Sequence, residues 1–305
     1  MTAWTTCGGL RGAARAALLG VVWVSCGLVS GCGASGAEAG EMEPAPASEV
    51  TPPDSVADWS AAFEAEGAVG TMVLLDTQTG RTVRHDPARA AERFSLASTS
   101  KIYNSLVFLD RGVISDVDSL FAWDGVERWA EVWNRDHSLR SGLEVSAVWL
   151  FQRAALQVGR GGYDDVFARE PFGNSTMSDA LEMSWLDGTW RVSADEQVAF
   201  LDRLRRGALA FSAEDQATVR DILPVLAEAG EVRVKGKTGW YVREPDPELG
   251  WLVGWVERPD GDLVFAMNAE QASGASFDIM RGRLRIVRAI LEGEGLWPVD
   301  PDEAP

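Results

Sequence analysis

Histidine and lysine are almost missing from this chain of 305 residues. His85 and His137 are the only histidines, and neither has a companion at ligand spacing, so the sequence disfavours a Ser-His-Asp triad and a histidine zinc site. Only three of the 28 basic residues are lysine, and these are Lys101, Lys235 and Lys237. A buried lysine can lose its proton, whereas an arginine cannot. Because arginine supplies the ordinary cations here, we expect the lysines to serve particular chemistry.

Cysteine is missing from the whole chain after position 32, since Cys7, Cys26 and Cys32 are the only three. The remaining chain therefore has no disulfide and no cysteine nucleophile, and the sequence indicates no metal site. The chain also has no excess of positive charge. A net charge of −18 argues against nucleic acid as a partner and against electrostatic docking on anionic lipid.

The first 31 residues are predicted to be a lipoprotein signal peptide, because Arg11 and Arg15 are followed by an apolar stretch too short to span a membrane. The segment Val29-Ser30-Gly31-Cys32 resembles a bacterial lipobox, so we expect Cys32 to be lipidated. Cys26 is the alternative acceptor, and an ordinary cleaved signal peptide is the alternative to both.

Residues 32–53 are rich in Ala, Gly, Glu and Pro and are predicted to form a flexible tether. Residues 54–300 are then expected to form the globular domain, which the motifs described below indicate to be catalytic. Together with the signal peptide, this predicts an exported protein that a lipid anchor holds on a membrane, facing the periplasm or the cell surface.

The domain reads as an α/β (α+β) fold with strands at both ends of the chain. Residues 70–76 and 81–84 are expected to form a hairpin, and Ser98 to begin a helix whose buried stripe is Ile102, Leu106 and Leu109. Residues 115–210 look mostly helical. Strands are expected at 231–241, 250–257 and 262–268, and a helix at 277–292. This order predicts a central antiparallel sheet flanked by helices, with a mostly helical subdomain inserted.

The segment Ser98-Thr99-Ser100-Lys101 is an S-x-x-K. At a helix start the first and last of these side chains share a face one turn apart, where a base can reach a hydroxyl proton. The helix N-terminus also favours a developing oxyanion. Taken alone the pattern is weak, because a capping serine beside an exposed lysine fits it equally.

Further motifs follow in a fixed order: S-x-V at 146–148, F-G-N at 172–174, Trp185-Leu186, and K-T-G at 237–239. Longer segments accompany them at 94–99, 123–125, 133–137, 146–152, 193–197 and 250–255. Together they resemble the class D, oxacillinase-type serine β-lactamases over roughly residues 54–298. The resemblance implies a β-lactamase/transpeptidase-like fold.

The resemblance also implies catalytic roles. Ser98 is the expected nucleophile. CO2 is expected to carboxylate Lys101 to N6-carboxylysine, an anionic base that the Trp185 indole N–H stabilises. Ser146 is expected to relay protons to the leaving nitrogen, and Lys237 to line the strand edge of the site.

Substrate binding is implied for Val148, Thr238, Gly239, Trp240 and an arginine of the last helix. The N–H groups of Ser98 and Trp240 would form the oxyanion hole. Arg283 matches the arginine position best when counted back from Pro298, with Arg281 as the alternative.

The expected function is hydrolysis of β-lactam antibiotics, above all penicillins, without a metal or a dissociable cofactor. A penicillin-sensing receptor domain that is acylated without turnover is the alternative, and a penicillin-binding peptidase is a third reading. Three positions depart from the family pattern, namely Ser100, Tyr103 and Phe172. Oligomeric state and substrate range are left open.

Overall fold

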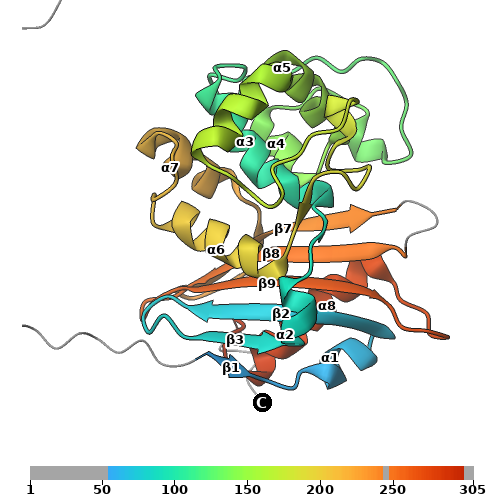
Figure 1. The fold of residues 1–305 in the computed structure, drawn as a ribbon, viewed down its shortest axis with the longest axis vertical. Coiled ribbons are helices and arrows are strands. Elements are labelled where there is room, and N and C mark those ends of the chain that lie inside the picture. The colour runs from blue at the N-terminus through green and yellow to red at the C-terminus, as the bar shows by residue number, and fades with distance from the viewer. Residues whose placement is uncertain (1–53, 243–246, 299–305) are drawn as a thin grey trace, which may run out of the picture. The chain divides into compact units, whose positions relative to one another are not determined.

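The structure, a computed structural model, describes residues 54–242 and 247–298 (Figure 1). The predicted signal peptide, tether and Cys32 lie outside these residues. The described chain is built around a seven-stranded sheet with the order β1-β3-β2-β9-β8-β7-β6. Its strands are β1 (Ser55–Val56), β2 (Ala68–Asp76), β3 (Thr82–His85), β6 (Val225–Ala229), β7 (Val232–Tyr241), β8 (Leu249–Glu257) and β9 (Leu263–Gln271). Only the short β1–β3 pair is parallel.

The predicted central antiparallel sheet is confirmed, with strands from both ends of the chain side by side. Strand β2 pairs with its hairpin partner β3 on one edge and with β9 on the other. The expected strands at 231–241, 250–257 and 262–268 correspond to β7, β8 and β9. Strand β6 was not predicted, because its five residues are half-exposed and lack a clear alternation.

Helices cover the sheet on both faces and form a separate group above it (Figure 1). They are α1 (Ser60–Glu64), α2 (Pro87–Ala91), α3 (Ser100–Asp110), α4 (Leu139–Glu144), α5 (Val148–Arg169), α6 (Ala194–Arg205), α7 (Ala213–Ile222) and α8 (Ile279–Gly293). Three 3-10 turns are η1 (Ala97–Thr99), η2 (Glu131–Trp133) and η3 (Leu181–Met183), and β4 (Phe94–Ser95) pairs with β5 (Arg191–Val192) in a second small sheet.

The apolar core is divided by the sheet. On one face α1 and α8 bury Phe63, Ile286 and Ile290 against the strands. On the other face α3, α5 and α6 share a larger cluster that includes Leu106, Phe151 and many aromatic rings. A helix on each side buries both faces of β7, β8 and β9, which makes these strands a rigid support for side chains at the sheet edge.

Two sequence-based expectations were incomplete. Residues 115–138 and 170–193 are not helical apart from η2 and η3. In the first stretch polar side chains bond the backbone: Asn134 Oδ1 accepts from Arg128 N at 2.8 Å and Asp136 Oδ1 from Trp123 N at 2.8 Å. Helix α3 buries Ser100 to Phe108 on every side instead of one stripe, since α4, α5 and α7 all contact it. Within the described ranges no helix has the length and hydrophobicity needed to cross a bilayer.

Candidate active site

Ser98 lies in the tight connection between β4 and α3. The preceding Ala97 has φ 48°, a left-handed conformation that is costly for a residue with a Cβ. This turn places Ser98 in η1, and the regular helix begins two residues later, at Ser100. Side chains hold the turn: Ser100 Oγ donates to Ala97 O at 2.8 Å and Thr99 Oγ1 to Leu96 O at 2.7 Å. The strained turn presents the half-buried Ser98 before a helix that is buried from Ser100 to Phe108.

Lys101 is completely buried and donates from Nζ to Ser98 Oγ at 2.8 Å. Burial, and then repulsion from Lys237, hold the pKa of Lys101 well below its ordinary value. The other near neighbour of the amine is an aromatic ring, since Nζ lies 5.2 Å from the centre of Phe151. The predicted spacing of the S-x-x-K therefore brings the two groups into direct contact, with an amine that favours its neutral form.

Trp185 is fully buried, and its indole Nε1 has no hydrogen-bond partner. Its own carbonyl accepts from Ser95 Oγ at 2.9 Å, which ties it to the segment three residues before the nucleophile. Asn174 of the F-G-N closes the loop that carries Trp185, because its side chain bonds Thr189 O and Arg191 N. An orphaned buried donor is rare and costly, so it calls for an acceptor.

Ser146 sits between α4 and α5 in a second left-handed conformation, with φ 60°. Hydrogen bonds from Ser146 N to Leu143 O and from Ala147 N to Gly142 O hold this corner. Val148 then begins α5. Ser146 lines the cavity, and like Ala97 it is a non-glycine residue in a strained, left-handed conformation.

The K-T-G lies on β7, which pairs with β8 along its length. Lys237 is buried, and burial followed by repulsion from Arg283 lowers its pKa to about 7. A Cβ on Gly239 would stand 3.2 Å from Leu96 O and 3.1 Å from the Trp251 Cβ. A side chain at this position would therefore push β7 and the turn before Ser98 apart by a few tenths of an ångström.

Arg283 of α8 is 5% exposed and donates from Nη1 to Gly239 O at 2.6 Å. Its Nε has no partner, and burial lowers its pKa to about 10. Arg281, the alternative from the sequence, is exposed on the same helix. Only Arg283 of the two lines the cavity.

These residues surround a cavity of about 340 Å³. The predicted residues that line it are Ser98, Ser146, Val148, Thr238, Trp240 and Arg283. Lys101, Trp185, Lys237 and Gly239 are not among its lining residues. Tyr103 and Phe172, which depart from the family pattern, stack on each other in the core at 5.2 Å and do not line it.

Sequence reasoning missed an aromatic rim to this cavity. Trp129, 74% exposed, has its ring 5.2 Å from Trp133 and 6.1 Å from Trp240. Leu186 and Met280 add apolar surface. Trp129 and Trp133 belong to the irregular segment before α4, where no periodicity marks which side chains meet. The available sequence signal for this rim was that two tryptophans, Trp129 and Trp133, lie close together in the chain.

Three buried basic side chains stand together in the site without an ion pair among the described residues. Among the described residues, none of Lys101, Lys237 and Arg283 forms an ion pair with a carboxylate. Each of the first two is repelled by the next in the series. The described part of the chain also gathers no group of metal-ligating side chains. The arrangement is suited to anions, and it places a nucleophile beside a deprotonatable amine.

Comparison with known proteins gives consistent results. The family Penicillin binding protein transpeptidase domain matches residues 70–292. The chain is 37% identical over 247 residues to Beta-lactamase OXA-2 of Salmonella typhimurium, covering 80% of this chain and 86% of that protein. It is 35% identical over 241 residues to Beta-lactamase OXA-48 of Klebsiella pneumoniae, covering 79% and 89%.

Solved structures agree with these relatives. The class D β-lactamase FUS-1 (OXA-85) of Fusobacterium nucleatum subsp. polymorphum has a TM-score of 0.73 at 30% identity, covering 78% of this chain and 97% of that chain. The C-terminal domain of the Bacillus licheniformis BlaR penicillin-receptor has a TM-score of 0.75 at 28% identity, covering 81% and 98%.

Proposed function

This chain belongs to the class D β-lactamases, and from that premise we propose how its residues divide the reaction among them. The family, the fold and the activity expected from the sequence are confirmed: the protein is a serine enzyme that hydrolyses β-lactam antibiotics. The roles of single residues, the carboxylation of Lys101 and the lipid anchor are our proposals.

Ser98 is the nucleophile of the proposed reaction. Its Oγ bonds to the lactam carbonyl carbon, the lactam C–N bond breaks, and the acyl group stays on Ser98 as an ester. The proton that leaves Oγ ends on the lactam nitrogen, with the Ser146 hydroxyl as the relay. The N–H groups of Ser98 and Trp240 stabilise the oxyanion. A water then cleaves the ester and frees Ser98.

Lys101 is carboxylated on Nζ in the active enzyme. The observation that carries this proposal is the Trp185 indole N–H, which is buried without an acceptor beside the loop that packs on the nucleophile turn. A neutral amine is needed to capture CO2, and burial favours the neutral form of Lys101. The carbamate supplies an anionic base for the Ser98 hydroxyl and for water. Trp185 donates to it, and Lys237 balances its charge.

Arg283 binds the carboxylate of the substrate from the far end of the cavity. Its Nε is unpartnered and buried while Nη1 is held by Gly239 O, so the guanidinium is fixed before substrate arrives. Thr238 lies on the adjacent strand edge, and Val148 lines the opposite wall. In this arrangement the substrate carboxylate gives the buried Arg283 an anionic partner.

Turnover of a chromogenic penicillin tests the function. The enzyme consumes many equivalents, whereas a sensor domain that is acylated without turnover would stop at one. Ser98→Ala abolishes both turnover and covalent labelling, seen as the loss of the acyl mass increment. Labelling that survives in this variant means that another residue is the nucleophile.

The mature protein begins at a lipidated Cys32 and is held on a membrane surface facing the periplasm or the outside. The support is the lipobox-like Val29-Ser30-Gly31-Cys32 and the polar tether after it. One acyl chain binds a membrane only marginally, whereas several anchor it stably despite the acidic charge. Cys32→Ala moves active enzyme to the soluble fraction or blocks processing, while the matched variant Cys26→Ala stays on the membrane. Membrane retention of a processed Cys32→Ala protein refutes the anchor.

A further inference from the structure

The segment 193–197, one of those that accompany the catalytic motifs in the sequence, has no part in the proposed reaction. Its last residue, Gln197, is buried one turn into α6. A capping box of Ser193 and Glu196 fixes the start of this helix, which packs on β2, β8 and β9. The Gln197 side chain leaves α6 toward the nucleophile, and its Nε2 donates to Thr99 Oγ1 at 2.8 Å. Thr99 directly follows Ser98 in the chain.

The Thr99 hydroxyl passes this contact on to the nucleophile turn. Thr99 is buried, and its Oγ1 donates to Leu96 O at 2.7 Å. Because a carbonyl oxygen can only accept, the hydroxyl hydrogen points to Leu96 and the hydroxyl oxygen accepts from Gln197. This order also fixes which end of the Gln197 amide faces Thr99. A directed chain of two hydrogen bonds thus connects a helix packed on the sheet to the turn that carries Ser98.

Ala97 is the residue of this turn that needs to be held, since its φ of 48° is costly for a residue with a Cβ. The two peptide planes on either side of a residue define its φ and ψ. The plane before Ala97 carries Leu96 O, and the plane after it carries Ala97 O, which accepts from Ser100 Oγ at 2.8 Å. The Ser100 bond stays within the turn, whereas the Thr99 bond is tied to α6. The second plane also carries the Ser98 N–H that we propose for the oxyanion hole.

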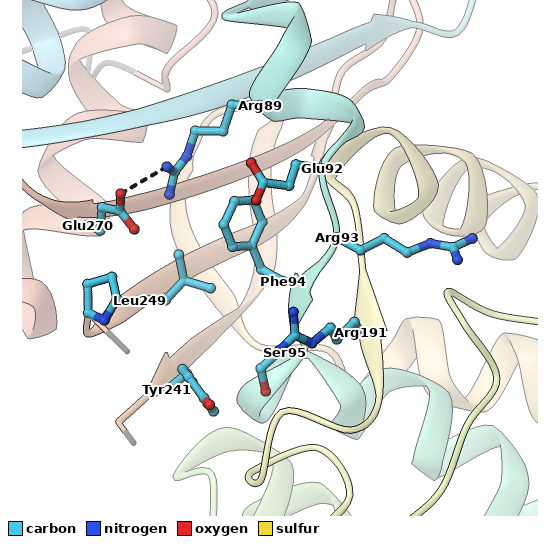
Figure 2. Close-up of a pocket in the computed structure, with 10 residues that line it drawn as sticks. Arg89, Glu92, Arg93, Phe94, Ser95, Arg191, Tyr241, Leu249 and Glu270 are labelled. Carbon is cyan, nitrogen blue, oxygen red and sulfur yellow. Dashed lines mark hydrogen bonds and ion pairs between the residues drawn. The ribbon is translucent and has the colours of Figure 1, made fainter. Parts of the chain in front are cut away.

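The chain before the turn has room to relax. Figure 2 shows Phe94 and Ser95 of β4 at a cavity of about 340 Å³, so this strand is not tightly packed on that side. Ser95 itself is held through its side chain and its carbonyl by bonds of 2.9 Å. The next residue is held less firmly, because Leu96 N lies 3.4 Å from Trp190 O. The short bond from Thr99 Oγ1 to Leu96 O is therefore important for keeping the turn in place.

We propose that Gln197 is a positioning residue for acylation, which acts through Thr99 to keep the nucleophile turn in its reactive conformation. The inference rests on Ser98 as the proposed nucleophile. Gln197 Oε1 is buried and has no partner among the described residues, so the amide is a poor choice for stability alone. A hydrophobic side chain of the same length would avoid that cost. The hydrogen bond to Thr99 is what an amide adds at this position.

The variant Gln197→Met tests the proposal, because methionine keeps the length of the side chain and removes the donor. Stopped-flow acylation by a chromogenic penicillin, over a range of concentrations, separates the dissociation constant of the noncovalent complex from the acylation rate constant. We expect the rate constant to fall about 10- to 100-fold through misplacement of the reacting groups, with the dissociation constant unchanged. The midpoint of urea unfolding should stay close to that of wild type, because the unpaired Oε1 is lost together with the hydrogen bond.

The matched control is Gln216→Met, a second buried glutamine, on α7. Its amide bonds the backbone of residues 209–212 at both ends and does not contact the nucleophile turn. We therefore expect the opposite result, a lower urea midpoint with an unchanged acylation rate constant. If both variants lose the same share of the rate together with stability, the effect of Gln197 is a general loss of stability and the proposal is wrong.

A double-mutant cycle tests the path through Thr99. Thr99→Val should slow acylation at least as much as Gln197→Met does, and Thr99→Ser should restore most of that rate, because serine keeps the hydroxyl. Adding Gln197→Met to Thr99→Val should slow acylation no further, since both interrupt the same chain. Effects that multiply overturn the proposal, and so does a wild-type rate in Gln197→Met.

Thr99→Val decides in the same assay if Gln197→Met does not fold, and a wild-type rate in Thr99→Val then overturns the proposal. Wild type labelled on Ser98 is the reference for every comparison. If wild type is not labelled there, the proposed function fails and this inference fails with it. If wild type is labelled and the variants acylate equally fast, the inference alone fails.

Discussion

Replacing Trp185 by phenylalanine tests the carboxylation of Lys101, because it removes the one N–H group proposed to donate to the carbamate. The substitution keeps an aromatic ring in the core and removes the indole N–H, which has no partner in the uncarboxylated site. In buffer free of CO2 we therefore expect a small loss of stability, caused by the smaller ring alone. The matched variant is Trp190→Phe. That indole donates to Phe172 O at 3.0 Å, and Ser175 N donates to the same oxygen at 3.1 Å. Removing the indole N–H therefore leaves the oxygen with a donor and costs the net worth of one hydrogen bond, about 0.5–1.5 kcal/mol more.

Added bicarbonate should reverse the order of the two variants, so that Trp185→Phe becomes the more damaging substitution. A hydrogen bond to a charged group contributes about 1.5–3 kcal/mol, so Trp185→Phe should raise the half-saturating bicarbonate concentration about 10- to 150-fold. In wild type, bicarbonate should also raise the free energy of unfolding as a bound ligand does. This stabilisation should be largely lost in Trp185→Phe and kept in Trp190→Phe.

The assay has two readouts. Penicillin turnover is titrated with bicarbonate after the enzyme has been depleted of CO2, and the carbamate is observed directly by 13C NMR with labelled bicarbonate. Stopped-flow acylation and deacylation rates should show that deacylation slows more. If Trp185→Phe has the half-saturation of wild type, or if Trp190→Phe weakens bicarbonate equally, the indole N–H is not the donor and the proposal fails.

Other predictions follow from the three buried basic residues, Lys101, Lys237 and Arg283. Activity should fall as the pH is lowered, since a protonated Lys101 cannot recapture CO2, and added bicarbonate should restore it; a pH profile indifferent to bicarbonate contradicts this. Arg283→Ala should lower kcat/KM about 10- to 100-fold by removing a charge-assisted hydrogen bond, while Arg281→Ala, on the exposed face, should not; the reverse result would move the carboxylate site. Lys237 has a pKa of about 7 in the folded protein and an ordinary value of about 10.4 when unfolded, so the unfolded state binds more protons between these values. The free energy of unfolding in CO2-free buffer should therefore rise with pH from about 7 to about 10, and Lys237→Met should flatten that slope in urea titrations; identical slopes would show that Lys237 stays charged.

The sequence was informative wherever chemistry restricts the residue type. Scarcity of lysine pointed to Lys101 and Lys237, and both are buried at the site. Lys235 has a different use, because its Nζ bonds Arg220 O at 2.6 Å near the end of α7. The strands β7 to β9 were predictable as well, since apolar runs between clear turns leave few alternatives.

Irregular structure could not be predicted in the same way. The segment before α4 is held by side chain to backbone bonds whose partners lie several residues away, so no periodic pattern reveals it. Trp129 and Trp133 reach the mouth of the cavity only because of that path. The positive φ at Ala97 and Ser146 was equally hidden, because neither residue type favours it.

Arg283 shows that spacing along a helix does not by itself identify which arginine faces the site. Four arginines share α8, and their spacing alone leaves Arg281 and Arg283 as candidates. The structure separates them by burial, since Arg283 bonds Gly239 O behind β7 while Arg281 is exposed. Burial is the main cause of the lowered pKa of Lys101 and of Lys237, and repulsion from Lys237 and from Arg283, respectively, adds to it. The packing of α8, β7 and α3 supplies both effects. The capacity of Lys101 to capture CO2 is therefore a property of the folded sheet edge, and substitutions at Arg283 or Lys237 should alter it without touching Lys101.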